Sequence, residues 1–297
     1  MRSRVLAAAS LCGLAALALT GCQSTPTASA SEAPITIATL PVSDDPTAVN
    51  PTDALVSLLE AETGREVEVM DVPDYLSVVE AIRSDHVDMG IMSGFPSALA
   101  VNTGEVDALL AWKGSTDPVS TCVVLNDSPI TKVEDLRDKT VAFADQASSS
   151  GYFMPVYMLH EAGLEQDTDY KAQFAGGHEG SFAALKQGQV DAACTANALT
   201  QMGAPMFPFA EGEWRAVGQS RAMDITGTVL ARQSLDAETR TLLQEALPKV
   251  FSEQNAEALA AYSTFTGLDV ELDPTPASFS SFANIAAVAG VELEDLK

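Results

Sequence analysis

Three consecutive serines, Ser148, Ser149 and Ser150, form the densest group of hydrogen-bond donors in the chain. They follow a β-branched and aromatic segment, 140–144, and precede a segment with helical character. Backbone N–H groups at a helix start lack internal partners and carry the positive end of the helix dipole. With Gly151, the serines could therefore hold a tetrahedral oxyanion through neutral donors. The alternative is a capped helix start behind a polar loop, and Pro155 favours a helix that begins close to it.

A second donor is expected from His178, which follows Gly176 and Gly177 in a loop after a predicted strand. Paired glycines let the backbone turn sharply and bring the imidazole into a cleft, where a ring N–H can donate to an anion. A single loop histidine is also common on plain protein surfaces. The histidines of the chain show no metal-ligand spacing, and neither a metal nor a cofactor is expected.

Two similar runs of elements would position these residues. The first run alternates strands at 35–40, 67–70 and 87–92 with helices at 52–62 and 74–83. The second alternates strands at 140–144, 170–174 and 190–194 with helices at 152–161 and 181–186. Such β-α-β-α-β runs are typical of parallel sheets that bind ligands at the carboxyl ends of their strands.

One detail relates the two runs. In the first, Ala81-Ile82 precede a polar turn and then Val87-Asp88; in the second, Ala184-Leu185 precede a polar turn and then Val190-Asp191. The sequence therefore predicts an α/β protein with two lobes of similar construction. A further strand at 227–232 and later helices at 237–247, 253–262 and 278–288 are assigned to the first lobe.

Charge excludes some classes of partner. The chain has 41 Asp and Glu against 16 Lys and Arg, a net charge of −25. So acidic a protein is not expected to bind nucleic acid or an anionic lipid surface. Its long-range field would also repel an anionic solute, so any anion site must depend on local, oriented donors.

The first residues have the pattern of an export leader. Arg2 and Arg4 precede an uncharged run rich in Ala and Leu, which ends in Leu19-Thr20-Gly21-Cys22. This end resembles a lipobox, so residues 1–21 are expected to be removed and Cys22 to carry a lipid. Residues 22–33, rich in Ser, Thr, Ala and Pro, are expected to be a flexible tether to the membrane. The expected location is extracytoplasmic and membrane-anchored.

Two further cysteines, Cys122 and Cys194, remain after the leader and the lipid site are set aside. Outside the cytoplasm a disulfide between them would persist. The sequence alone leaves open whether they are bridged or are two buried thiols.

Taken together, several of these segments resemble the phosphate, phosphite and phosphonate-binding proteins of ABC importers. The family pattern is a strand followed by Asp-x-x-Ser-(Thr/Ser)-Ser-Gly-Tyr-x-x-Pro and then by a Gly-Gly-His loop. The chain has both parts in that order, and the resemblance covers about residues 35–193 and, more weakly, 227–232. Pro41, Asp74-Tyr75, Val87-Asp88 and Val190-Asp191-Ala192 also fit the family pattern.

The resemblance implies a two-lobed type II periplasmic-binding-protein fold, each lobe a mixed, mainly parallel sheet flanked by helices, with two crossovers at the hinge. Lobe 1 would comprise 34–120 and 198–297, and lobe 2 would comprise 121–197. It also implies a monomer that binds a small phosphorus oxyanion without catalysis and delivers it to the permease subunits. The implied disulfide joins Cys122 to Cys194 within lobe 2, where it would not restrain closure of the lobes.

Carried over residue by residue, the family pattern implies that Ser148, Ser149, Ser150 and Gly151 hold the phosphorus oxygens. His178 would donate from the same lobe, and Tyr75 would reach across from the first lobe. Without the resemblance, Tyr75 could equally be a packing residue.

The chain departs from the family pattern at two places. Ala98 stands where the family commonly has an aromatic residue, which predicts a roomier first-lobe wall, and Ser93 adds a polar group there. Near the late strand, either Asp224 or Thr226 occupies the position where an acid would meet a ligand ammonium, so the preferred anion stays open.

Three other functions compete with this interpretation. A binding protein of the same fold could carry a sulfonate or another oxyanion, or could serve a sensor instead of an importer. A secreted hydrolase could use Ser149, His178 and Asp191 as a triad, or Ser220 in an incomplete nucleophile elbow at 218–222. The elbow segment, however, leads toward a strand and not a helix.

Overall fold

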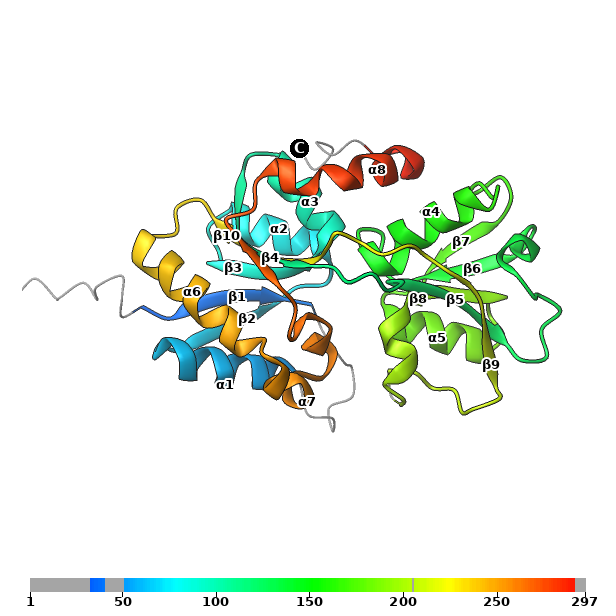
Figure 1. Cartoon of the computed structure of the whole chain (residues 1–297), viewed down its shortest axis with the longest axis horizontal. Helices are drawn as coiled ribbons and strands as arrows, with labels where there is room; N and C mark the ends of the chain where they lie inside the picture. The colour runs from blue at the N-terminus through cyan, green and yellow to red at the C-terminus, as the bar shows by residue number, and fades with distance from the viewer. Residues whose placement is uncertain (1–32, 41–50, 205, 292–297) are drawn as a thin grey trace, which may run out of the picture.

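The chain folds into two lobes with a cleft between them (Figure 1). The structure, a computed structural model, describes residues 33–40, 51–204 and 206–291. The expected leader, Cys22, nearly all of the expected tether and Pro41 lie outside the described residues. Within the described ranges, no helix is long and apolar enough to cross a bilayer.

Lobe 1 is built on a six-stranded mixed sheet. In spatial order its strands are β11 (Val270–Leu272), β4 (Val106–Lys113), β10 (Ile225–Arg232), β3 (Met89–Ser93), β1 (Ile35–Thr39) and β2 (Val67–Asp71). The β1, β2 and β3 pairs are parallel, whereas β10 and β11 pair antiparallel to their neighbours. The expected parallel arrangement is therefore confined to the β-α-β-α-β run.

Helices cover both faces of this sheet, and each face has its own apolar core (Figure 1). One face is covered by α1 (Pro51–Thr63), α6 (Ala237–Val250) and α7 (Ala256–Leu259). The other is covered by α2 (Tyr75–Arg83) and α3 (Gly94–Asn102). Gly64 follows the last residue of α1 with φ +68°, a backbone conformation that glycine adopts without strain.

Lobe 2 repeats this construction on a five-stranded sheet. In spatial order its strands are β7 (Lys171–Phe174), β6 (Thr140–Phe143), β8 (Ala192–Ala196), β5 (Ser120–Leu125) and β9 (Trp214–Gln219). α4 (Met154–Glu161) packs on one face and α5 (His178–Lys186) on the other. Val141 and Phe143 pack with the α4 side chains and Ala142 with those of α5, as alternation along a strand requires.

The acids of the two matching segments, Asp88 and Asp191, make the same contact in the two lobes. Asp88 accepts the N–H of Thr36 at the start of β1 (2.8 Å), and Asp191 accepts the N–H of Thr140 at the start of β6 (2.8 Å). The preceding turns also correspond, since Asp85 and Gly188 both have a positive φ. In each lobe this contact fixes the start of the first strand of the run, whose opposite end reaches the cleft.

The chain crosses between the lobes at 114–119 and again at 220–224. The sequence placed the return crossing at 197/198, but β9 pairs with β5 in the second sheet. Lobe 2 therefore extends to Gln219, and the expected boundary is corrected. The sequence did not indicate β9 as a strand, because its side chains are mostly half-buried and do not alternate sharply between apolar and polar.

A second connection between the lobes is made by packing. Phe95 of α3 stacks on Phe153, at the start of α4, with ring centroids 3.7 Å apart. Phe282 meets the edge of Phe95 at 5.6 Å. The final helix, α8 (Ala283–Ala289), continues from there across to α4 (Figure 1). The lobes thus share one apolar core on the face opposite α5 and α7.

The helix expected at 253–262 is broken. The structure has a 3₁₀ turn at Glu253–Asn255, then α7, then a second 3₁₀ segment at Ala260–Phe265, and Ala260 has φ +45° at the break. The break lets Phe265 stack on Trp112, with ring centroids 4.5 Å apart. Burying these rings together outweighs helix propensity here. The helix expected at 278–288 likewise begins as a 3₁₀ segment, Pro276–Phe282.

Cys122 and Cys194 are joined by a disulfide between the adjacent strands β5 and β8. Both side chains are fully buried in lobe 2. The bridge therefore braces one sheet and leaves the two crossings free.

We expect the double variant Cys122→Ala with Cys194→Ala to unfold more readily. The bridge closes a chain separation of 72 residues, and removing such a crosslink costs about 2–4 kcal/mol. Thermal unfolding should show a melting temperature lower by roughly 5–15 °C. Ligand affinity should stay within about threefold of wild type, because the bridge lies within one lobe; a large loss of affinity at unchanged stability would contradict this assignment.

Candidate functional site

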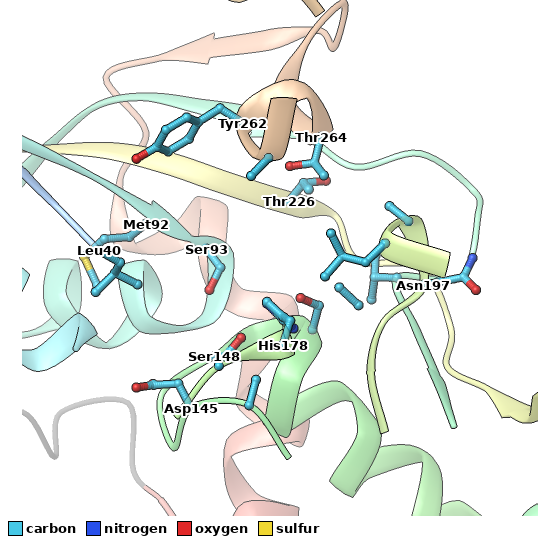
Figure 2. A pocket seen from close by; sticks show the side chains of 18 of the residues that line it. Leu40, Met92, Ser93, Asp145, Ser148, His178, Asn197, Thr226, Tyr262 and Thr264 are labelled. Carbon is cyan, nitrogen blue, oxygen red and sulfur yellow. The ribbon is translucent and has the colours of Figure 1, made fainter. Parts of the chain in front are cut away.

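The cleft between the lobes has a volume of about 830 Å³ and is lined from both sides. Lobe 2 contributes Ser148, Ser150 and His178, and lobe 1 contributes Tyr75, Ser93 and Thr226. Figure 2 shows Ser148 and His178 side by side in the middle of the cleft, with Ser93 above them. Six of the nine expected binding residues therefore share one cavity.

The donor loop, 148–151, folds around its first serine. Ser148 is almost fully buried, and its Oγ accepts the N–H of Gly151 (3.1 Å) as an N-cap. Its carbonyl accepts the N–H groups of Tyr152 and Phe153 (3.1 Å each). The bond from Gly151 uses an acceptor lone pair, so the hydroxyl proton can still be donated into the cleft.

Ser149 has a different role from the expected one. Its side chain is fully buried and does not line the cleft. Its Oγ accepts the N–H of Phe95 at the start of α3 (2.7 Å), and its own N–H donates to Ser93 Oγ (3.2 Å). Ser149 thus joins lobe 2 to lobe 1 behind the cleft. Gly151 also lies behind the cleft surface, where its N–H is used by Ser148.

His178 is the first residue of α5, where a loop residue was expected. Gly177 precedes it as the cap residue, and the ring is partly buried. Its Nδ1 is hydrogen-bonded to Thr195 Oγ1, which leaves Nε2 as the nitrogen available to a ligand. Burial lowers the pKa of His178 to about 4, so the imidazole is uncharged at neutral pH. When Nδ1 accepts the hydroxyl proton of Thr195, the neutral ring carries its own proton on Nε2, so His178 then offers a neutral donor and not a cation.

The low pKa of His178 predicts a stability change with pH. The folded-state pKa is about 4 against an ordinary value of 6.5, so the unfolded chain takes up this proton first as pH falls. His178 thus stabilises the fold fully above pH 6.5, and this contribution is lost between about pH 6.5 and 4. Between pH 7 and 5, wild type should lose about 1–2 kcal/mol more unfolding free energy than His178→Asn.

Urea denaturation at several pH values measures this difference. The same substitution at the exposed His86 is the matched control. Equal pH slopes for wild type and His178→Asn would refute the assignment of a neutral, partly buried imidazole.

The lobe 1 wall is formed by Tyr75 and Ser93, which are hydrogen-bonded to each other. Asp74 caps α2 by accepting the N–H of Ser77 (2.8 Å), and this cap places Tyr75 at the cleft. Burial raises the pKa of Tyr75 to about 12, so its hydroxyl stays protonated. Ala98, expected to widen this wall, is instead fully buried in the lobe 1 core.

Thr226 and Asp224 lie in different surroundings, and one of the two lines the cleft. Thr226 lines the cleft, whereas Asp224 is exposed and does not line it. The backbone carbonyl of Asp224 accepts the N–H of Gly114, so it links the two chain crossings (2.8 Å). Of the two expected alternatives, Thr226 is the one that faces a ligand.

Cleft residues that the sequence did not single out come from two places. Asp145 lies two residues beyond β6 and is half-buried; burial raises its pKa, which the N–H of Ala147 opposes and the charge of Asp74 reinforces. Tyr262, Thr264 and Phe265 enter the cleft because the helix is broken at Ala260. The acid of the family-like Asp-x-x-Ser segment could have indicated Asp145 as a site residue. No pattern in the sequence indicated the cleft residues that follow Ala260.

The electrostatics of the cleft come from neutral donors. No Lys or Arg is among its lining residues in the described ranges, whereas Asp117, Asp145 and Glu179 are. The N-terminal ends of α2, α3 and α5 and of the π-turn at Ser149–Phe153 meet at this cleft. Dipole ends and hydroxyls are the groups available to an anion.

The serine, histidine and acid that could have formed a hydrolase triad have other partners. Ser149 bonds to lobe 1, His178 to Thr195, and the carboxylate of Asp191 to the N–H of Thr140. Ser220 accepts the N–H of Ser120 (3.0 Å) at the start of the second crossing. A triad requires the serine to bond to the histidine and the histidine to bond to the acid, and these contacts join none of the three to another.

Two lobes joined by two chain crossings around such a cleft define a solute-binding protein fold, and solved structures of this kind match the chain. A binding protein component of an ABC phosphonate transporter from Pseudomonas aeruginosa has a TM-score of 0.71 at 17% identity, covering 87% of both chains. PhnD1 from Prochlorococcus marinus, in complex with methylphosphonate, has a TM-score of 0.68 at 16% identity, covering 85% of this chain and 97% of that one. At these identities the similarity establishes the fold.

The family model described as "ABC transporter, phosphonate, periplasmic substrate-binding protein" matches residues 37–271, and the chain belongs to this family. The phosphate-import protein PhnD of Mycolicibacterium smegmatis is 29% identical over 171 residues, which cover 53% of each chain. The chain spans about half the length of the curated relatives it matches.

Proposed function

We propose that this protein is an extracytoplasmic solute-binding lipoprotein that captures a phosphorus oxyanion for an ABC importer. The observation that carries the proposal is the donor loop 148–151, which lies beside a neutral imidazole in a cleft without Lys or Arg among the described lining residues. Membership of the phosphonate-binding family supports the choice of phosphorus over other oxyanions.

In this proposal the protein binds and releases its ligand without changing it. Ser148, Ser150 and His178 receive the anion on lobe 2, and Tyr75 and Ser93 contact it from lobe 1. Four or five charge-assisted hydrogen bonds of about 1.5–3 kcal/mol each suffice for micromolar affinity after the cost of closure. A ligand that bridges both lobes stabilises the closed arrangement, which the permease would recognise.

Calorimetric titration with phosphite, methylphosphonate, aminoethylphosphonate, phosphate and sulfate tests the ligand class. At least one phosphorus oxyanion should bind at least tenfold more tightly than sulfate. Preference for sulfate, or for an alkanesulfonate added to the panel, would move the protein to the other oxyanion class. Binding of none of these solutes would overturn the proposal.

The lipid anchor is proposed from the sequence around Cys22. The full chain expressed in a bacterial host should partition with membranes and incorporate a fatty-acid label, whereas Cys22→Ala should do neither.

The monomeric state is a further proposal, which sedimentation of the chain without its leader would check.

A further inference from the structure

Helix α3 of lobe 1 is capped by a serine of lobe 2. Ser93 occupies the N-cap position of α3 and has the extended backbone of a capping residue (φ −69°, ψ 162°), yet its side chain makes no capping bond within the described chain. A cap accepts the N–H of the second or third helical residue, and the third here is Pro96, which has no N–H. The N–H of Phe95 is therefore the one to be capped, and Ser149 Oγ accepts it at 2.7 Å.

The hydroxyl proton of Ser149 has one acceptor. Its Oγ is fully buried and takes the Phe95 N–H on one lone pair. Among the described residues, the other polar atom bonded to this oxygen is Ser93 Oγ, at 3.1 Å. Because a buried hydroxyl without an acceptor is strongly disfavoured, the proton is donated to Ser93. The backbone N–H of Ser149 is donated to the same Ser93 oxygen (3.2 Å).

These two donations decide where the Ser93 proton points. A hydroxyl has two acceptor lone pairs and one proton, and Ser149 fills both lone pairs from behind the cleft. The Ser93 proton must then face forward. Ser93 lines the cleft, and Figure 2 shows its side chain pointing toward Ser148 and His178.

The bond between Ser93 and Tyr75 has the same direction. Burial raises the pKa of Tyr75 to about 12, and the hydrogen bond from the Ser93 side chain opposes this rise, as a donor to the phenol oxygen does. When Ser93 donates to Tyr75, the proton of the tyrosine is left for the ligand. When an anion accepts from Ser93 instead, the serine donates to it directly. In both cases this wall of the cleft presents a proton to the anion.

We propose that Ser149 is a positioning residue of the anion site, which acts on the ligand through Ser93. By capping α3 from the other lobe, Ser149 releases Ser93 from that task and fixes the Ser93 hydroxyl as a donor toward the cleft. Without Ser149 Oγ, Ser93 would accept the Phe95 N–H itself, and its hydroxyl would turn away from the ligand. This inference rests on the proposed function, and it depends on Ser93, a position at which the chain departs from the family pattern.

Calorimetric titration of a double-mutant cycle with methylphosphonate tests this role. Ser93→Ala and Ser149→Ala should each weaken binding about tenfold, whereas the double variant should lose no more than about threefold beyond either one. Ser149→Thr keeps the hydroxyl, and the family pattern allows threonine there, so its affinity should stay within about threefold of wild type. Single losses that multiply to about a hundredfold would mean that Ser149 acts on the ligand independently of Ser93. That result would overturn the inference alone, whereas a wild type that bound no phosphorus oxyanion would overturn the proposed function as well.

Ser97→Ala is the matched control. Ser97 is fully buried in α3 and does not line the cleft, and its hydroxyl donates to the carbonyl of Ser93 (2.9 Å). The substitution removes a buried hydroxyl at the start of α3 but leaves the Ser93 hydroxyl in place, so affinity should stay within about threefold of wild type. A tenfold loss for Ser97→Ala would assign the effect of Ser149 to the packing of α3 and would contradict the proposal.

A crystal structure of Ser149→Ala gives a readout that is independent of affinity. Ser93 Oγ should turn to within about 3.2 Å of the Phe95 nitrogen and so take over the cap. A Ser93 hydroxyl that still faced the cleft in this variant would refute the proposed role of Ser149.

Discussion

Ser148→Asp is expected to reduce affinity for the phosphorus oxyanion about 1,000-fold while the protein stays folded. Aspartate is as good an N-cap as serine, so it can still accept the N–H of Gly151 that Ser148 Oγ accepts (3.1 Å). Its charge, however, would face the ligand anion from an almost fully buried position. Two like charges about 4 Å apart repel by about 4 kcal/mol at an effective dielectric constant of about 20, which is close to three orders of magnitude in affinity.

Ser148→Asn is the matched control for this substitution. Asparagine has the size of aspartate and the same capping ability, but it is neutral. Calorimetric titration should show a loss of about tenfold for Asn, and thermal unfolding should place both variants within a few degrees of wild type. Equal losses for Asp and Asn would mean that size, and not charge, governs this position, which would contradict the oxyanion assignment.

Gly151→Ala is expected to be the most damaging single-methyl change in the donor loop. A Cβ at Gly151 would lie 2.5 Å from Ala144 Cβ, 2.9 Å from Ser148 Oγ and 3.0 Å from His178 Cε1. Relieving these contacts must move both Ser148 and His178. We expect a loss of at least tenfold in affinity together with about 1–3 kcal/mol of unfolding free energy.

Gly177→Ala serves as the control for that change. Its Cβ would meet no atom within 4 Å, although the residue also lies beside the oxyanion site. Urea denaturation should therefore show near wild-type stability for Gly177→Ala, with affinity within about threefold. If Gly151→Ala bound and unfolded like Gly177→Ala, the tight packing assigned to the donor loop would be wrong.

Local patterns in the sequence were sufficient for the repeated part of the fold. Strands such as β1 and β6 are short apolar runs bounded by turn residues. Each is followed by a segment of helical length before the next strand of the run begins. The paired turns before Asp88 and Asp191 indicated two similar lobes, and the structure gives both acids the same contact. The bridge between Cys122 and Cys194 was predicted by resemblance to the family, because spacing alone does not fix a disulfide.

Long-range contacts explain what the sequence did not predict. Ser149 has the same chemistry as its neighbours, and only the approach of α3 from the other lobe assigns it to Phe95 and Ser93. The return crossing was misplaced because β9 belongs to lobe 2 through pairing with β5, a contact between segments far apart in the chain. The cleft wall around Phe265 depends on stacking with Trp112, which overrides a helical pattern.

A crystal structure of the mature protein with methylphosphonate tests the central claim most directly. The claim is that neutral donors, without a Lys or Arg, hold the oxyanion in the cleft. The account predicts phosphonate oxygens within about 3.2 Å of Ser148 Oγ and His178 Nε2. Phosphonate bound outside the cleft, or held there by a lysine or arginine side chain, would contradict it.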